Sequence, residues 1–244
     1  MAVVGPGVIG TTVAAALHEA GRTPHLYGRR AREHLELRVE ERRILVPGPV
    51  QTDPAQAKEP VDLVFLAVKA TQIEAASPWL AALCSPQTVV YVLQNGVEQR
   101  AMPAPYIAGG QVIPSVVWFP AEAKPDGSVR LRRDARLTLP DTSGSRLVLE
   151  ALRATRCAVE LATDFTSVAW RKLLQNAVAG LIVLTRRRSG MYGRTDLADR
   201  EAGRALEWDI RNGIVQRRGQ AHGIPTPISD VVVPLIAAAS DGPG

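Results

Sequence analysis

A glycine pattern near the start of the chain constrains the fold more than any other feature. Gly5, Gly7 and Gly10 have the spacing GxGxxG, directly after a short apolar segment and directly before a helical one. The first glycine permits a tight turn, the second lets the backbone approach a pyrophosphate, and the third lets helix and strand pack closely. The pattern predicts a dinucleotide-binding loop, with a tight turn that binds nothing as the alternative. The loop residues are Gly5, Pro6, Gly7, Val8, Ile9 and Gly10.

Short apolar runs alternate with helical patterns over the first part of the chain. Such runs are typical of a parallel sheet that is buried on both faces. We expect strands at residues 2–4, 24–28, 61–68 and 88–93, and helices at 9–20 and 71–83. Pro78 is expected to end or bend the second helix. The alternation predicts an α/β fold with a Rossmann-type, doubly wound parallel sheet.

The pattern changes along the rest of the chain. Residues 111–118 form another apolar run, and Pro125, Asp126 and Gly127 predict a hairpin on the edge of the sheet. Beyond about residue 164 the pattern is purely helical, with helices expected at 165–185, 195–222 and 229–239. We therefore place a domain boundary near Thr163, with a Rossmann domain over residues 1–163 and a small all-helical domain over residues 164–244.

The end of the second strand indicates which dinucleotide is bound. A cofactor with a free ribose 2′-hydroxyl is usually met there by an acidic residue, but this strand ends in Gly28, Arg29 and Arg30. Guanidinium groups suit the bidentate capture of a 2′-phosphate. The strand end therefore favours NADP(H) over NAD(H). A solvated basic turn is the competing interpretation.

Composition limits the partners and the compartment. The net charge is +5, but the arginines are spread along the chain and lack the interleaved aromatic residues of a base-stacking surface. We therefore expect an anionic small molecule rather than nucleic acid. No apolar run reaches the roughly 18 residues that a membrane helix needs, and the segment MAVVGPGVIG has the character of neither a basic leader nor a cleavage signal. We therefore expect neither membrane insertion nor secretion. The two cysteines, Cys84 and Cys157, are far apart, so a reducing cytoplasm is the expected compartment.

Lysine is scarce, which draws attention to where it occurs. Of the 29 lysine and arginine residues only four are lysines; Lys69 closes an apolar run, and Lys172 lies in a mostly apolar helix. Arginine keeps its proton near neutral pH, whereas burial can lower the pKa of a lysine enough for acid–base chemistry. Lys172 is therefore a candidate proton donor. The alternative is that the base composition of the genome favours arginine codons and that the remaining lysines are placed by chance.

Two further groups accompany Lys172. Asn176 follows four residues later, on the same helix face. Gly180 is next on this face and, since it has no side chain, leaves a gap there. Together they predict the floor of a polar substrate site, or else an exposed polar stripe. A carboxylate from the later helix, such as Glu207 or Asp209, would hold the ammonium and tune its pKa. Surface salt bridges are the alternative for these two acids.

With these residues in hand, the chain resembles the ketopantoate reductases. GPGVIG resembles the family's nucleotide loop, AVKATQ its segment with a cofactor-side lysine, and LQNGVE its Asn-Gly turn, which gives Lys69 and Asn95. WRKLLQN resembles the catalytic helix, which implies that Lys172 is the general acid and Asn176 a substrate-binding amide. GRALEWDIRNG resembles GRxTEIDxING, which implies that Glu207 is an active-site carboxylate on the cofactor side. Thr195 falls where the family has a substrate-binding serine, and Asn95 is implied to contact both cofactor and substrate.

The chain also departs from this family pattern. The family has a second asparagine where Gly180 stands, and the segment between Lys172 and Glu207 is shorter than usual. We therefore expect several helices of the usual substrate domain to be absent. The apolar surface that they would cover makes self-association, as a homodimer, an expectation.

The expected activity is NADPH-dependent reduction of 2-dehydropantoate (ketopantoate) to pantoate, with Lys172 protonating the nascent alkoxide. Asn95, Asn176 and Thr195 would hold the polar groups of the substrate. Two alternatives stay open at this point. One is a β-hydroxyacid dehydrogenase, or a reductase of another 2-oxo acid, whose catalytic helix also uses lysine and asparagine four residues apart. The other is a non-catalytic NADP(H)-binding sensor, which the shortened substrate domain would favour.

Overall fold

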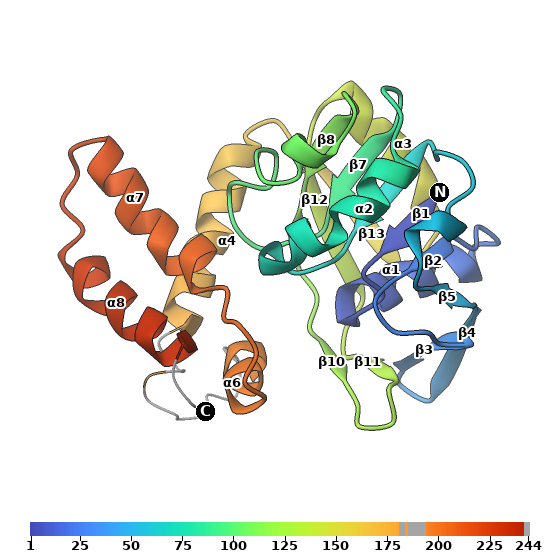
Figure 1. The fold of residues 1–244 in the computed structure, drawn as a ribbon, viewed down its shortest axis with the longest axis horizontal. Helices are drawn as coiled ribbons and strands as arrows, with labels where there is room; N and C mark the ends of the chain where they lie inside the picture. Colours follow the sequence, from blue (N-terminus) through green and yellow to red (C-terminus); the bar gives the residue numbers. More distant parts are fainter. Residues whose placement is uncertain (181–183, 185–193, 242–244) are drawn as a thin grey trace. The chain divides into compact units, whose positions relative to one another are not determined.

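The computed structural model describes residues 1–180, 184 and 194–241 (Figure 1). The chain forms two compact units. The first contains Met1–Gln94 and Gln99–Phe165, and the second contains Thr166–Gly244 together with the short segment Asn95–Glu98.

A six-stranded parallel sheet organises the first unit. Its strand order is β5-β2-β1-β6-β7-β8, and every neighbouring pair runs parallel. The order reverses between β1 and β6, as in doubly wound nucleotide-binding sheets. This arrangement confirms the predicted fold class. The strands are β1 (Ala2–Val4), β2 (His25–Tyr27), β5 (Val50–Gln51), β6 (Leu63–Leu66), β7 (Val89–Val92) and β8 (Gln111–Pro114).

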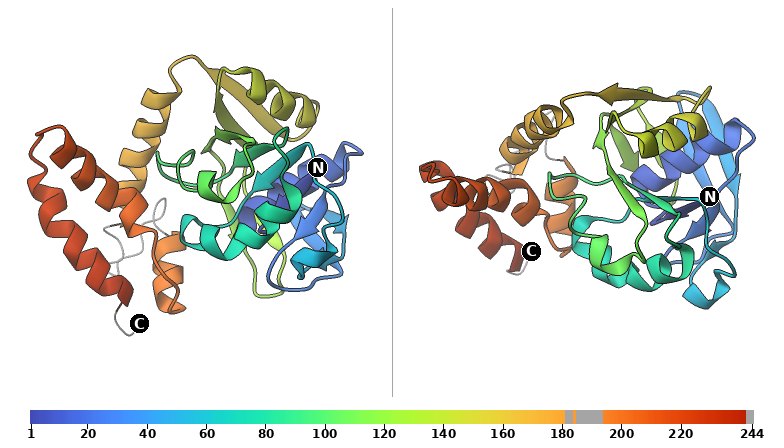
Figure 2. Two further views of the ribbon diagram at one scale, coloured as in Figure 1. Left: turned by 45° about the horizontal axis from the view of Figure 1, so that its top comes forward. Right: turned by 90° about the horizontal axis from the view of Figure 1, so that it is seen from above.

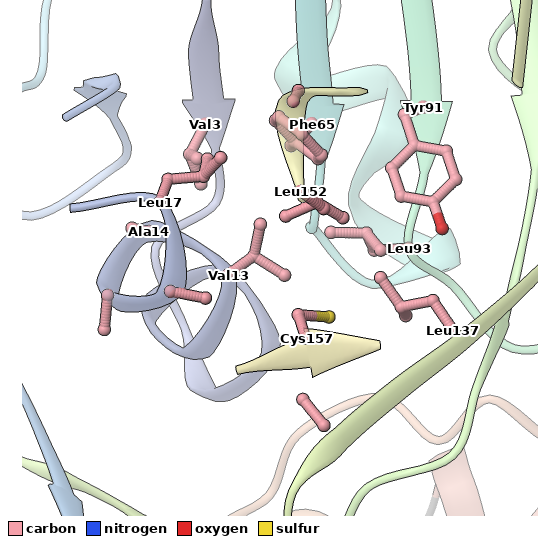
Figure 3. Packing of buried hydrophobic residues seen from close by; sticks show 14 of the residues in the cluster. Val3, Val13, Ala14, Leu17, Phe65, Tyr91, Leu93, Leu137, Leu152 and Cys157 are labelled. Atoms are coloured by element: carbon pink, nitrogen blue, oxygen red, sulfur yellow. The ribbon is translucent and has the colours of Figure 1, made fainter. Parts of the chain in front are cut away.

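Both faces of this sheet are buried, because alternate side chains of each strand belong to different hydrophobic clusters. Val3, Phe65 and Tyr91 belong to one hydrophobic cluster with residues of α1 (Val8–Glu19), among them Val13 and Leu17, whose side chains are labelled in Figure 3. The neighbouring strand residues pack with Trp79 and Leu80 of α2 (Ile73–Leu83). Helices α1 and α2 therefore cover opposite faces of the sheet.

Helix α2 does not end at Pro78, as the proline had suggested it could. Trp79, Leu80 and Leu83 lie beyond the proline and are buried. Their packing against the sheet outweighs the one backbone hydrogen bond that a proline cannot donate.

Two smaller sheets complete the first unit. The hairpin predicted around Pro125–Gly127 is confirmed, as β10 (Ala121–Ala123) pairs antiparallel with β11 (Val129–Leu131). It does not extend the parallel sheet, however. Instead β11 pairs with β3 (His34–Val39), which pairs with β4 (Arg42–Pro47). The third sheet has the order β13-β12-β9. Its strands are β13 (Cys157–Ala162), β12 (Ala135–Pro140) and β9 (Val116–Val117), with α3 (Ser143–Ala151) between β12 and β13.

The second unit is helical in its described part. Its helices are α4 (Phe165–Gly180), α6 (Arg194–Glu201), a π-helical turn (Asp209–Gly213), α7 (Ile214–Ala221) and α8 (Pro227–Asp241). Helix α4 accounts for the first expected helix up to Gly180; residues 181–183 and 185 lie outside the described residues. Helices α7 and α8 lie side by side in both views of Figure 2.

The single helix expected over residues 195–222 is wrong in one respect. It is interrupted after α6, where the backbone N–H of Arg204 donates to the carbonyl of Asp199 at 2.8 Å. The guanidinium of Arg204 also pairs with the Asp199 carboxylate at 2.8 Å. These contacts close α6 and redirect the chain before the π-helical turn. Among the helices that the structure describes, none has the length and apolar character to cross a membrane.

Candidate active site

The glycine loop joins β1 to α1 in the first unit. Gly5 has a φ of +86°, and its N–H donates to the carbonyl of Tyr27 at 2.9 Å. A Cβ at Gly10 would lie 2.4 Å from the carbonyl oxygen of Gly5, whereas a Cβ at Gly7 would have no atom within 4 Å. Gly5 and Gly10 are therefore needed for the turn itself, and Gly7 faces open space.

The N-terminus of α1 has the properties of an anion site. Gly7 caps the helix without any side-chain hydrogen bond, and the first turn has no acidic residue. The first N–H groups of a helix lack partners within the helix and carry a partial positive charge. A pyrophosphate that approached Gly7 would accept hydrogen bonds from these groups. This loop therefore fits a dinucleotide.

The other predicted cofactor residues follow neighbouring strands of the same sheet. Arg29 and Arg30 form an exposed turn after β2. Lys69 is half-buried and follows β6, beside the glycine loop, since a Cβ at Gly5 would touch Val68. A Cβ at Gly28 would lie 2.7 Å from Pro6. Gly28 therefore lets β2 pack against the loop.

Three predicted polar residues meet in the second unit. Asn176 Nδ2, on α4, donates to Asn95 Oδ1 at 3.0 Å. Asn95 Nδ2 lies 3.5 Å from Glu207 Oε2, at the limit of a hydrogen bond. A chain of polar side chains thus connects the Asn-Gly turn, the lysine helix and the segment before the π-helical turn. These are three segments that lie far apart in the sequence.

The charged groups of this cluster include a cation, Arg211, that the sequence did not suggest. Glu207 was predicted to hold Lys172, and this stays a prediction; the carboxylate of Glu207 forms an ion pair with Arg211, whose Nη2 lies 2.9 Å from Oε2. Burial lowers the pKa of Lys172, as predicted, and the Arg211 guanidinium lowers that pKa further. Arg211 therefore acts on the pKa of Lys172 in the same direction as burial. An ammonium with a lowered pKa gives up its proton more readily.

Comparison with known proteins identifies the family. Residues 1–144 match the family model described as "Ketopantoate reductase PanE/ApbA". A 2-dehydropantoate 2-reductase of Mycobacterium tuberculosis is 45% identical over 291 aligned positions, which cover 100% of this chain and 99% of that protein. The chain belongs to the ketopantoate reductase family. A 2-dehydropantoate 2-reductase of Caulobacter vibrioides is 32% identical, with 98% of this chain and 99% of that protein covered.

Solved structures agree on the fold of this ketopantoate reductase. A dimeric ketopantoate reductase from Staphylococcus aureus superposes with a TM-score of 0.87 at 20% identity, covering 100% of this chain and 99% of that one. A D-mandelate dehydrogenase solved with NADH has a TM-score of 0.81 at 19% identity, with both chains covered completely. Ketopantoate reductases are NADP-dependent oxidoreductases, so the expected enzyme class and cofactor are confirmed.

The alignment also bears on chain length. It spans 291 positions, whereas this ketopantoate reductase has 244 residues, so the relative from M. tuberculosis has residues with no counterpart here.

Gly180 is the last residue of α4, and Thr195 lies in α6. The side chain of Thr195 is outside the described part of the structure, so its predicted substrate contact stays a prediction.

Sequence reasoning missed two buried residues of the cluster, Arg211 and Asn212. Asn212 Nδ2 donates to the carbonyl of Ala177 at 3.1 Å and so fastens the π-helical turn to α4. Arg211 could have been noticed, because it stands where the pattern GRxTEIDxING has an isoleucine. An arginine at a position that is apolar in the family is a signal of a new charge in the core.

Proposed function

We propose that this ketopantoate reductase converts 2-dehydropantoate to pantoate, a step of pantothenate biosynthesis, with Lys172 as the proton donor. Bound NADPH supplies the hydride that reduces the C2 carbonyl carbon. The Lys172 ammonium gives its proton to the carbonyl oxygen, which becomes the hydroxyl of the product. The observation that carries this role is that Lys172 is half-buried, with a lowered pKa, in the cluster that also holds Asn95, Asn176 and Glu207.

The other predicted residues receive roles in the same proposal. Residues 1–163 would bind the cofactor and residues 164–244 the substrate. Gly5, Pro6, Gly7, Val8, Ile9 and Gly10 would hold the pyrophosphate, with Lys69 beside them. Asn95 and Glu207 would contact the cofactor as well as support the substrate site. Asn176 and Thr195 would bind polar groups of the substrate.

A substrate panel tests the proposed activity. NADPH oxidation is followed with 2-dehydropantoate, an aromatic 2-oxo acid and a 3-oxo acid as substrates. We expect the highest kcat/KM with 2-dehydropantoate. A preference for the aromatic acid would assign a different 2-oxo acid, and a preference for the 3-oxo acid would favour β-hydroxyacid chemistry. Cofactor binding without turnover of any substrate would indicate a sensor.

The proposed preference for NADPH rests on Arg29 and Arg30. Replacing both with alanine should raise the Kd for NADPH by about 10-fold and leave the Kd for NADH unchanged, because only NADPH has the 2′-phosphate. Fluorescence titration with each cofactor measures this. Arg146→Ala, which removes an exposed arginine of α3, is the control and should change neither Kd. Equal losses for both cofactors would assign the turn a role other than phosphate recognition.

We also infer that the protein self-associates in the cytoplasm, without nucleic acid. Helices α4 and α8 of the second unit expose large apolar side chains, which are Leu174, Val178, Ile228, Val231 and Leu235. Exposed apolar groups of this number favour contact with a second copy. The two buried cysteines are free, in keeping with a reducing compartment. Sedimentation velocity should show a dimer that V231K/L235K weakens; a monomeric wild type at all concentrations would contradict self-association.

A further inference from the structure

The Asn-Gly turn, residues 95–98, brings a polar side chain to the cluster without being part of a helix or a strand. Asn95 accepts a hydrogen bond from Asn176 at 3.0 Å. Gly96 has a φ of +103°, in the left-handed region that favours glycine. The conformation of a short irregular segment depends on the contacts that hold its ends.

The side chain of Gln99 closes the base of this turn. Its Nε2 donates to the backbone carbonyl of Gln94, directly before the turn, and to the carbonyl of Ser115 at 2.8 Å. Its Oε1 accepts from the backbone N–H of Ser115 at 2.7 Å. Both N–H groups of the amide are therefore used, together with its oxygen. Gln99 is 4% exposed, so water does not compete for these hydrogen bonds.

The pairing of Gln99 with Ser115 imitates that of a neighbouring β-strand, because one amide gives both a donor and an acceptor to the same backbone residue. A glutamate at this position would lack the N–H donors. An asparagine would be one methylene shorter and would not reach both partners from the same backbone position. Glutamine therefore suits this place better than either related side chain.

Ser115 is anchored to the parallel sheet. It follows Pro114, the last residue of β8, and its Oγ donates to the carbonyl of Val92, the last residue of β7. Gln94 is fixed from another side, since its Nε2 donates at 2.8 Å to the carbonyl of Val68, just after β6. The start of the turn is therefore tied to the carboxyl ends of β6, β7 and β8. Doubly wound sheets bind their ligands at this edge.

These hydrogen bonds belong to the first unit, whereas the turn itself is grouped with the second. Gln94 and Gln99 are the residues at which the chain leaves the first unit and returns to it. The Gln99 side chain therefore fixes both of these points at once. The carbonyl that it holds on Gln94 is part of the peptide bond to Asn95, so the backbone at Asn95 is constrained directly.

We propose that Gln99 is a positioning residue of this ketopantoate reductase: it fixes the backbone before Asn95 and so presents the Asn95 amide to cofactor and substrate. This rests on the proposed function, in which Asn95 contacts both. Gln99 acts through Asn95, since its own amide is committed to Gln94 and Ser115. A side chain that is held in place before its ligands arrive loses less conformational freedom when they bind.

A double-mutant cycle between Gln99 and Asn95 tests the proposal. The measured quantities are the Kd for NADPH, from fluorescence titration, and kcat/KM for 2-dehydropantoate. Gln99→Met keeps the length of the side chain and removes its amide; it should raise the Kd about fivefold and lower kcat/KM about 10-fold. In an Asn95→Ala background the same substitution should change either quantity by less than about twofold, because no amide remains to be positioned.

Thr88→Val is the matched control, because it removes buried hydrogen bonds just before the other end of β7. Thr88 Oγ1 donates to the carbonyl of Val61 at 2.7 Å and accepts from the N–H of Ser85 at 2.8 Å. Gln99→Met and Thr88→Val should both lower the unfolding temperature, but Thr88→Val should change neither Kd nor kcat/KM. Should Gln99→Met fail to fold, Gln99→Asn replaces it in the cycle. Its shorter amide keeps part of the hydrogen bonding and should raise the Kd about threefold.

The outcomes separate the proposal from the function on which it rests. A loss that disappears in the Asn95→Ala background supports the positioning role. The same loss with and without the Asn95 amide, or no loss at all, would show that Gln99 serves only the stability of the fold, and the proposal would be overturned. A wild type that does not reduce 2-dehydropantoate would instead overturn the proposed function. The cycle in Kd needs no turnover, so it would still decide the role of Gln99.

Discussion

Lys172→Ala is expected to lower kcat by about 10²- to 10⁴-fold, the usual contribution of a positioned general acid. Water would have to protonate the nascent alkoxide in the variant, without the fixed geometry of the ammonium. NADPH should still bind, because the glycine loop and the two arginines belong to the first unit. Steady-state oxidation of NADPH measures kcat, and a fluorescence titration measures cofactor affinity.

A matched lysine controls this experiment. Lys124 lies in the hairpin of the first unit and pairs with Glu122 at 3.4 Å. Lys124→Ala also replaces a lysine with alanine, but at a surface ion pair, and it should leave kcat unchanged. If kcat of Lys172→Ala stayed within a factor of about three of wild type, Lys172 would not be the proton donor.

The pH profile gives a second reading of the same group. Lys172 donates a proton only while it is charged, so kcat should fall as the pH rises through its pKa. Burial and Arg211 both lower that pKa from the ordinary value of 10.5. The alkaline limb should therefore have its midpoint below pH 10.5 and should disappear in the residual activity of Lys172→Ala. A limb that persists unchanged in the variant would belong to another group.

The parts of the fold with local signals were predictable. The glycine spacing, the apolar strands and the turn around Asp126 each depend on residues close together in the sequence, and the structure confirms all three. Strands β3 and β4 were missed although Leu35, Leu37, Ile44 and Val46 alternate with polar residues. The pairing of β3 with β11 joins segments about ninety residues apart, which a local pattern does not reveal.

The candidate site shows the same limit. Lys172, Asn176, Asn95 and Glu207 could be proposed because the sequence resembles known motifs around each of them. Which carboxylate faces which cation depends on how the helices of the second unit pack. Glu207 pairs with Arg211 on the next turn of its own segment, where four-residue spacing brings two side chains together. Spacing alone could have suggested this pair, but not that it would be buried beside a lysine of α4.

Substitutions in the glycine loop should have the second large effect. Alanine at Gly7 should weaken cofactor binding, whereas alanine at Gly10 should destabilise the fold. Gly7→Ala should fold normally, since the new Cβ meets no atom within 4 Å and the φ of −80° suits alanine. The methyl group would stand where a pyrophosphate must approach. The lost charge-assisted hydrogen bonds should raise the Kd for NADPH by about 10- to 100-fold.

Gly10→Ala should instead damage the fold. Its Cβ would lie 2.4 Å from the carbonyl oxygen of Gly5, which is fixed by a φ of +86° and by the hydrogen bond to Tyr27. Helix α1 would have to move away from the loop, at a cost of about 1–3 kcal/mol in the free energy of unfolding. Thermal unfolding without cofactor, together with NADPH titration, separates the two variants. If Gly7→Ala bound NADPH as wild type does, the open space at Gly7 would not be the phosphate site. Normal stability of Gly10→Ala would mean that β1 and α1 pack less tightly than the structure shows.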